Sequence, residues 1–196
     1  MKVPMVTEFW DLLLKLCSEE FMGSINEFSK VCLVIGVLST LKDEGEVLQL
    51  LEKKFGKISQ ISEKYDFSFT DYYDEEMGKR PERWFIVFQD LIDPQNLAEI
   101  KIQTNQIEEF FAKDGKRRIN LDPGILSLSN FILATTKDRS HRIPLKKGIY
   151  GEVTLIYKDK KFNALDWTYA DYRSEKFEEL FKAYREDYKK KLRSLN

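Results

Sequence analysis

The residues best suited to acid–base or anion-binding chemistry lie within one short segment. Lys137, Arg139 and Arg142 surround Ser140 and His141, the single histidine of the chain. An arginine fork matches the oxygens of a phosphate or carboxylate, and an imidazole exchanges protons near neutral pH. The segment therefore predicts an anion clamp formed by Arg139 or Arg142, with Lys137 beside it and His141 as the candidate catalytic acid or base.

The same segment has a structural interpretation. If it were a strand, alternation would send Arg139 and His141 to one face and Ser140 and Arg142 to the other, so the four would not meet one ligand. Its cations would then pair in solvent with acidic residues of the 71–82 loop. Both interpretations remain open from the sequence.

Two further stretches are candidates for the rim of the same site. Arg118, Asn120 and Asp122 precede a Pro-Gly pair, a composition typical of a turn at the end of a strand. Such a turn also presents Asp122 to a ligand hydroxyl or a metal. Asp71 and Tyr73 are expected on the opposite rim, although an aromatic cap over the sheet explains that stretch equally well.

A group of aromatic residues near the C-terminus also has two interpretations. Trp167, Tyr169 and Tyr172, together with Arg173, have the side chains needed to stack on a nucleobase. Packing beneath the last helix explains the same residues, and the sequence does not decide between the two.

Charge is distributed unevenly along the chain. Residues 113–147 hold nine Lys and Arg against three Asp, a net +6, whereas the whole chain is −1. This asymmetry predicts a local anion site and not a binder of long polyanions. A pI near 6.0 and strands without a basic-aromatic motif disfavour nucleic acid as partner, although an RNA-binding sheet face is kept as an alternative.

Signatures of common cofactor and metal sites are missing from the sequence. There is no phosphate loop, no Gly-x-Gly-x-x-Gly, no His-Glu-x-x-His and no Gly-x-Ser-x-Gly. One histidine, with no cysteine near it, does not make a zinc or iron site, so no metal is assigned; a carboxylate-held Mg²⁺ stays open. The sequence identifies no cofactor.

The composition is that of a soluble globular protein, with 196 residues, 42% of them hydrophobic and 33% charged. No apolar run approaches the roughly 18 residues of a membrane span, and the first residues lack the pattern of an export signal. Cys17 and Cys32 lie in apolar runs and are expected as small buried hydrophobes. We therefore expect a cytoplasmic protein without membrane contact, and its oligomeric state stays undetermined.

Hydrophobic periodicity predicts the elements that must position the site. Strands are expected at 31–38, 58–69, 84–88 and 117–121, with helices at 47–55 and 94–113. The order β-α-β-β-α-β predicts an α+β fold with a ferredoxin-like core, in which the first and third strands are central and the second and fourth lie at the edges. A parallel α/β fold is the alternative, but the connection between the second and third strands is too short for a crossover helix.

The remaining segments extend this core. Residues 125–135 are expected as a helix, although their β-branched and aromatic content also suits a strand, and residues 141–145 and 150–157 are expected as a hairpin. The predicted organisation is an N-terminal helical appendage at 1–29, with an amphipathic helix at 7–22, a core at 30–173 and an amphipathic helix at 174–196 packed on the core.

Several short strings, taken in order, resemble one prokaryotic family, domain of unknown function 4416. They are Phe-Thr-Asp-Tyr-Tyr (69–73), Glu-Met-Gly (76–78), Leu-Ile-Asp-Pro (91–94), Asn-Leu-Asp-Pro-Gly (120–124), Thr-Lys-Asp-Arg-Ser-His-Arg-Ile (136–143), Gly-Ile-Tyr (148–150) and Trp-Thr-Tyr (167–169). The resemblance covers about residues 30–173 and implies no activity. Members are sometimes labelled GTP-binding proteins, but this chain lacks the Asn-Lys-x-Asp guanine motif as well as the phosphate loop.

The hypothesis from the sequence is a pocket for a small phosphate- or carboxylate-bearing ligand, with a nucleotide among the candidates. An RNA-binding module and a protein-interaction subunit that uses its terminal amphipathic helices are the alternatives.

Overall fold

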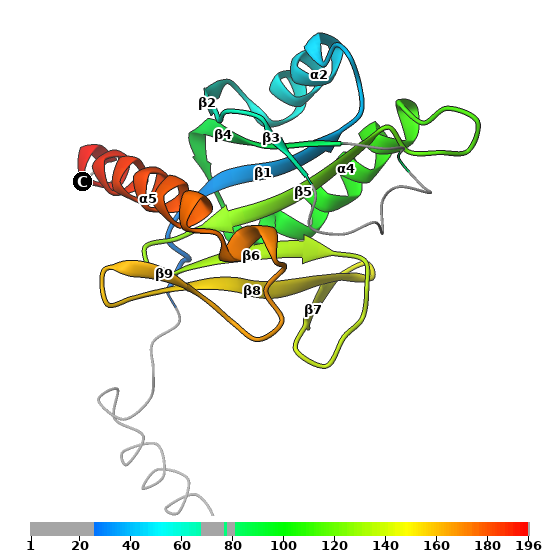
Figure 1. Ribbon diagram of the computed structural model, residues 1–196. Coiled ribbons are helices and arrows are strands. Elements are labelled where there is room, and N and C mark those ends of the chain that lie inside the picture. Colours follow the sequence, from blue (N-terminus) through cyan, green and yellow to red (C-terminus); the bar gives the residue numbers. More distant parts are fainter. Residues whose placement is uncertain (1–25, 68–76, 78–80, 196) are drawn as a thin grey trace, which may run out of the picture.

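The computed structural model describes residues 26–67, 77 and 81–195 (Figure 1). Its strands are β1 (Val31–Ser39), β2 (Ile58–Ile61), β3 (Tyr65–Asp66), β4 (Glu82–Ile92), β5 (Ile119–Leu126), β6 (Asn130–Thr135), β7 (Ile143–Lys146), β8 (Ile149–Lys158) and β9 (Lys161–Ala164). Its helices are α2 (Gly45–Phe55), α4 (Leu97–Phe110) and α5 (Glu175–Leu195), with 3₁₀ turns η2 (Pro94–Asn96) and η3 (Asp171–Arg173). The protein is therefore a mixed α and β structure, as predicted.

The strands of the described residues form one antiparallel sheet in the order β2-β4-β1-β5-β6-β8-β7, with β3 beside β4 and β9 beside β8. Strands β1 and β4 each have neighbours on both sides, as their continuous apolar runs predict. The expectation that the fourth strand lies at an edge is wrong. Strand β5 has β6 as its second neighbour, with pairs such as Gly124 and Leu133. The chain after β5 therefore extends the sheet with further strands.

The sheet has an apolar core on each face. Alternate residues of β1 point to opposite sides, so that Leu33 and Ile35 pack with residues of α2 and α4. Val34 packs on the other face with Phe181 and Tyr184 of α5. Figure 1 shows α5 crossing the sheet on the face opposite α2 and α4.

The helix expected at 125–135 is wrong, because this segment forms the end of β5, a turn and strand β6. The hydroxyl of Ser127 accepts hydrogen bonds from the backbone nitrogens of Ser129 (3.1 Å) and Asn130 (3.0 Å). These bonds close a tight turn, and the β-branched and aromatic residues on either side then pair as strands.

The Asp-Pro-Gly stretch after Leu121 is not a turn either. Pro123 pairs with Ile35 of β1, and a Cβ added at Gly124 would lie 2.5 Å from Cζ of Phe131. Glycine is therefore needed here for close approach of β6 and not for a turn. The prediction failed because local turn propensity was overridden by pairing on both sides of β5.

The helix predicted at 94–113 and the hairpin predicted at 141–145 and 150–157 are present, with bounds shifted by a few residues. Asp93 caps the start of the helical segment, its carboxylate accepting from the Gln95 nitrogen at 2.9 Å, and η2 leads into α4. Lys147 and Gly148 both have positive φ, 53° and 76°, as required in the two-residue turn that joins β7 to β8. The amphipathic helix predicted at 7–22 lies outside the described residues.

In the part of the chain that the structure describes, none of the helices combines the length and the apolar character needed to cross a membrane.

Candidate functional site

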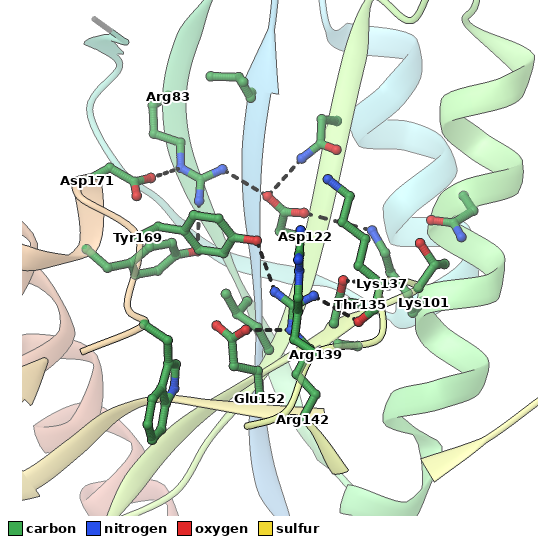
Figure 2. A pocket seen from close by; sticks show the side chains of 18 of the residues that line it. Arg83, Lys101, Asp122, Thr135, Lys137, Arg139, Arg142, Glu152, Tyr169 and Asp171 are labelled. Carbon is green, nitrogen blue, oxygen red and sulfur yellow. Dashed lines mark hydrogen bonds and ion pairs between the residues drawn. The ribbon is translucent and has the colours of Figure 1, made fainter. Parts of the chain in front are cut away.

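A cavity of about 660 Å³ lies beside the sheet, within the range typical of small-molecule sites. Its wall combines residues of β4, α4, β5 and β8 with the loop after β6 and the segment before η3 (Figure 2). The charged lining residues are Arg83, Lys101, Glu108, Arg117, Asp122, Lys137, Arg139, Arg142, Glu152 and Asp171, and His141, Trp167, Tyr169 and Tyr172 also line it. The cavity therefore gathers groups that lie far apart in the sequence.

Arg83 of β4 is a buried cation in the wall of this cavity. Its side chain is 5% exposed, and its Nε lies 3.2 Å from Oδ2 of Asp171, which is equally buried. Its Nη1 lies 3.3 Å from Oδ2 of Asp122, and its Nη2 donates to the Tyr172 hydroxyl at 2.8 Å. Burial lowers the pKa of Arg83, but these partners raise it more, so the net direction is upward and the guanidinium stays charged.

Asp122 lies where two sets of cations meet. Its Oδ2 accepts from Nδ2 of Asn120 at 2.8 Å as well as contacting Arg83, whereas Oδ1 lies 3.8 Å from Nζ of Lys101. Burial raises the pKa of Asp122, but Lys101 and Arg83 lower it more, and the net direction is downward. The carboxylate is therefore held ionised in the cavity wall.

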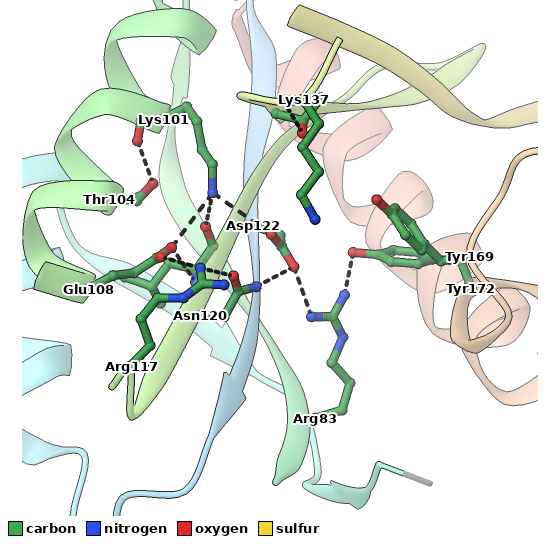
Figure 3. A network of polar contacts seen from close by, with 12 residues as sticks. Arg83, Lys101, Thr104, Glu108, Arg117, Asn120, Asp122, Lys137, Tyr169 and Tyr172 are labelled. Carbon is green, nitrogen blue, oxygen red and sulfur yellow. Dashed lines mark hydrogen bonds and ion pairs between the residues drawn. The ribbon is translucent and has the colours of Figure 1, made fainter. Parts of the chain in front are cut away.

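A second ionic group ties α4 to β5 (Figure 3). Oε1 of Glu108 accepts from the Leu121 nitrogen at 2.8 Å, and Oε2 accepts from Nη1 of Arg117 at 2.9 Å. Lys101 donates to the Leu121 carbonyl at 2.8 Å and lies 3.6 Å from Glu108. The helix and the strand are therefore fixed to each other directly beside Asp122.

Arg142 shapes the loop after β6. Its side chain is only 5% exposed, with Nε donating to Oε2 of Glu152 at 2.7 Å, Nη1 to the Lys137 carbonyl at 2.8 Å and Nη2 to the Tyr169 hydroxyl at 3.3 Å. Burial lowers the pKa of Arg142, but Glu152 raises it more. Arg142 therefore positions the loop and is already occupied by protein partners.

His141 is held by two neighbours. Its Nε2 lies 3.0 Å from Oε2 of Glu152, and its ring stacks on Trp167 with centroids 4.9 Å apart and planes 14° apart. Trp167 is fixed in turn by its indole N–H, which donates to the Val153 carbonyl at 2.9 Å.

The strand interpretation of this segment is wrong. Residues 136–142 form a loop, and Arg139, His141 and Arg142 all line one cavity. Arg139 differs from Arg142, since no residue in the described part of the chain forms an ion pair with its side chain. In Figure 3, Lys137 extends into the space between Asp122 and Tyr169.

The structure brings together most of the residues selected from the sequence. Asn120, Asp122, Lys137, Arg139, His141 and Arg142 all line the cavity. Arg118 is not among the residues that line the cavity, whereas Arg117 and Asn120 of the same stretch are. Asp71 and Tyr73 lie outside the described residues.

Sequence reasoning missed the buried charges of the site. Arg83, Lys101, Glu108, Glu152 and Asp171 were not selected. A usable signal existed for Arg83 and Glu152, since each is a charged residue directly beside apolar residues of a buried strand segment, where an unpaired charge is costly. Of the aromatic group, Trp167, Tyr169 and Tyr172 all line the cavity, and Tyr172 also packs in the core with Phe residues.

Within residues 26–67, 77 and 81–195, no group of three or more His, Cys, Asp or Glu side chains is arranged to hold a metal ion.

The fold and the site define a protein of mixed α and β structure whose sheet borders a cavity lined by six cations and four carboxylates among its described residues. Comparison with protein families identifies it further: the model of a domain of unknown function, DUF4416, matches residues 29–188. The chain therefore belongs to this family, which confirms the resemblance found in its sequence strings. No curated protein and no solved structure matches the chain.

Proposed function

We propose that this cavity binds a small anion, a phosphate- or carboxylate-bearing molecule, with a nucleotide among the candidates. The observation that carries the proposal is the charge of the described lining residues, which include six Lys and Arg side chains but only four carboxylates. Cavities lined by an excess of one charge concentrate ligands of the opposite charge.

The distribution of partners indicates which cations are available to a ligand. Arg83 pairs with Asp171 and Asp122, and Arg142 pairs with Glu152. These pairs form a fixed wall, because each buried charge is already compensated. Arg139 is exposed and has no ion pair among the described residues, so it is our choice for the direct contact with the anion.

A matched pair of arginine variants tests the proposal. We expect a panel of phosphate, citrate and nucleotides to raise the unfolding temperature, since a ligand at 100 times its Kd adds about 2.7 kcal/mol of stability. Arg139→Ala should weaken binding by about ten- to a hundredfold, as expected when a charge-assisted hydrogen bond of about 1.5–3 kcal/mol is lost. Arg118→Ala, which removes a nearby cation that does not line the cavity, should bind like the wild type.

Two results would contradict this function. One is the absence of any stabilisation across the panel by a protein that unfolds cooperatively. The other is an equal loss of binding in Arg139→Ala and Arg118→Ala, which would indicate a general effect of net charge and not a site.

We also propose a finer description of the fold, a ferredoxin-like unit made of β1, α2, β2, β4, α4 and β5. The strand order β2-β4-β1-β5 and the packing of both helices on one face support it. Strands β6 to β9 would then extend the unit beyond β5 and supply the loop that carries the cationic residues.

A further inference from the structure

The imidazole of His141 has one polar atom, Nδ1, that the described residues leave unused. Nε2 lies 3.0 Å from Oε2 of Glu152, and Trp167 stacks on the ring. No described residue forms a hydrogen bond with Nδ1. Because His141 lines the cavity, Nδ1 is the ring atom left for a ligand.

The surroundings of Glu152 determine which nitrogen carries the proton. The side chain of Glu152 is 2% exposed, and its Oε2 also accepts from Nε of Arg142 at 2.7 Å. Its Oε1 is buried and has no hydrogen-bond partner among the described residues, so within this part of the chain Oε2 makes the polar contacts of the carboxylate. An ionised carboxylate only accepts hydrogen bonds, so Nε2 of His141 must donate. In the neutral ring Nδ1 is then an acceptor.

We propose that Nδ1 of His141 accepts a hydrogen bond from the bound anion, so that the cavity selects oxyanions that carry an O–H group. Phosphate, phosphate monoesters in their monoanionic form and hydroxycarboxylates belong to this class, whereas sulfate does not. The inference rests on the proposed anion binding, with Arg139 supplying the charge and His141 the selectivity. It also makes Nδ1 the atom that would take the proton if the O–H bond of the ligand breaks, with the electron pair remaining on the ligand oxygen and Glu152 stabilising the imidazolium.

Asp122 is the competing acceptor in the same wall. Among the described residues, the polar partner of its Oδ1 is Lys101, at 3.8 Å, so Oδ1 can also accept from a ligand hydroxyl. An ionised carboxylate repels an anion, however, whereas a neutral imidazole accepts the same hydrogen bond without that repulsion. The experiment must therefore distinguish His141 from Asp122.

Hydrogen phosphate and sulfate are a matched pair of probes. Near pH 8 both are tetrahedral and predominantly dianions, but only phosphate carries a proton. We expect calorimetry on the full chain to show about tenfold tighter binding of phosphate, the effect of one hydrogen bond of about 1.4 kcal/mol. In His141→Phe, which keeps an aromatic ring against Trp167, phosphate should lose its advantage and bind only as tightly as sulfate.

Nuclear magnetic resonance gives a second test that does not depend on any variant. The chain has a single histidine, so one pair of imidazole ¹⁵N signals reports the state of His141. In the neutral ring we expect Nε2 to be protonated and Nδ1 unprotonated, and the Nδ1 signal to move with phosphate but not with sulfate. Glu152→Gln, whose amide can donate to Nε2, should populate both tautomers.

The outcomes separate this inference from the proposed function. Equal binding of both anions, lost in Arg139→Ala, would overturn the role of His141 and leave anion binding intact. A phosphate preference kept in His141→Phe and lost in Asp122→Asn would also overturn it, as would a neutral ring protonated at Nδ1. Binding of neither anion, nor of any member of the wider panel, would overturn both proposals.

Discussion

Replacing Arg83 by Met is the strongest test of how the cavity wall is held together. Arg83 is almost fully buried, and its guanidinium is the ion-pair partner of Asp171 and a donor to Tyr172. It also lies over the rings of Phe85 and Tyr172, 5.2 Å from each centroid. Methionine keeps much of the apolar stem but leaves the carboxylate of Asp171 buried without its cation.

The expected cost follows from that uncompensated charge. Removing one partner of a buried ion pair typically costs about 3–5 kcal/mol, more than the pair itself contributes, because the remaining charge stays desolvated. Burial raises the pKa of Asp171 and Arg83 lowers it, so without Arg83 this carboxyl has a further reason to take up a proton. Arg83→Met should therefore lose about 3–5 kcal/mol of unfolding free energy near neutral pH.

Urea unfolding followed by circular dichroism measures this loss. Lys147→Met is the matched control, because Lys147 and Glu99 form an ion pair at 3.0 Å with 56% and 46% of their side chains exposed. Surface pairs contribute about 0–1 kcal/mol. The double variant with Asp171→Asn should recover part of the loss of Arg83→Met. If Arg83→Met cost no more than Lys147→Met, the buried network would not hold the wall.

Three further predictions concern single groups. Gly124→Ala should cost about 1–3 kcal/mol in urea unfolding, because the new Cβ would overlap Phe131. Burial raises the pKa of Asp122, but its cationic neighbours lower it to below the ordinary value. The contribution of Asp122 to the unfolding free energy is therefore present above the unfolded pKa of about 3.9 and is lost as the pH falls through the folded pKa. The difference in unfolding free energy between wild type and Asp122→Asn should shrink below about pH 4. Burial raises the pKa of Cys32 to about 11, so in a Cys17→Ser background its thiol should react with a disulfide reagent at pH 8 far more slowly in the native than in the unfolded protein.

How much of the fold could be predicted depended on whether the local pattern agreed with long-range pairing. Strands β1 and β4 are buried along most of their length and contain the apolar stretches 31–38 and 84–88, so composition alone indicated central strands. Strand β5 contains Pro123 and Gly124, residues whose local preference is for turns. Its pairing with β1 and β6 overrides that preference, and no local pattern reports which strands will be neighbours.

The site divides in the same way. The loop with Arg139 and His141 was found because its charge stands out within about ten residues. Glu152 and Asp171 were missed because their role comes from cations 10 and 88 residues away, a relation that only the folded chain creates. Arg142 was selected as a clamp for a ligand, and in the structure its guanidinium is hydrogen-bonded to Glu152, Lys137 and Tyr169.

Most cations of the cavity are paired with carboxylates, and this pairing affects what the cavity can bind. Six cations that line one cavity would repel one another if no carboxylates lay among them. The four carboxylates offset that repulsion and leave an excess of positive charge. The paired groups cost no reorganisation when a ligand arrives, which is the condition for a preorganised polar site. Affinity then depends on few contacts, with Arg139 exposed to salt and His141 stacked and partly buried. Salt should therefore weaken the binding of phosphate and sulfate alike through Arg139, while leaving the ratio between them, which we assign to Nδ1, nearly unchanged.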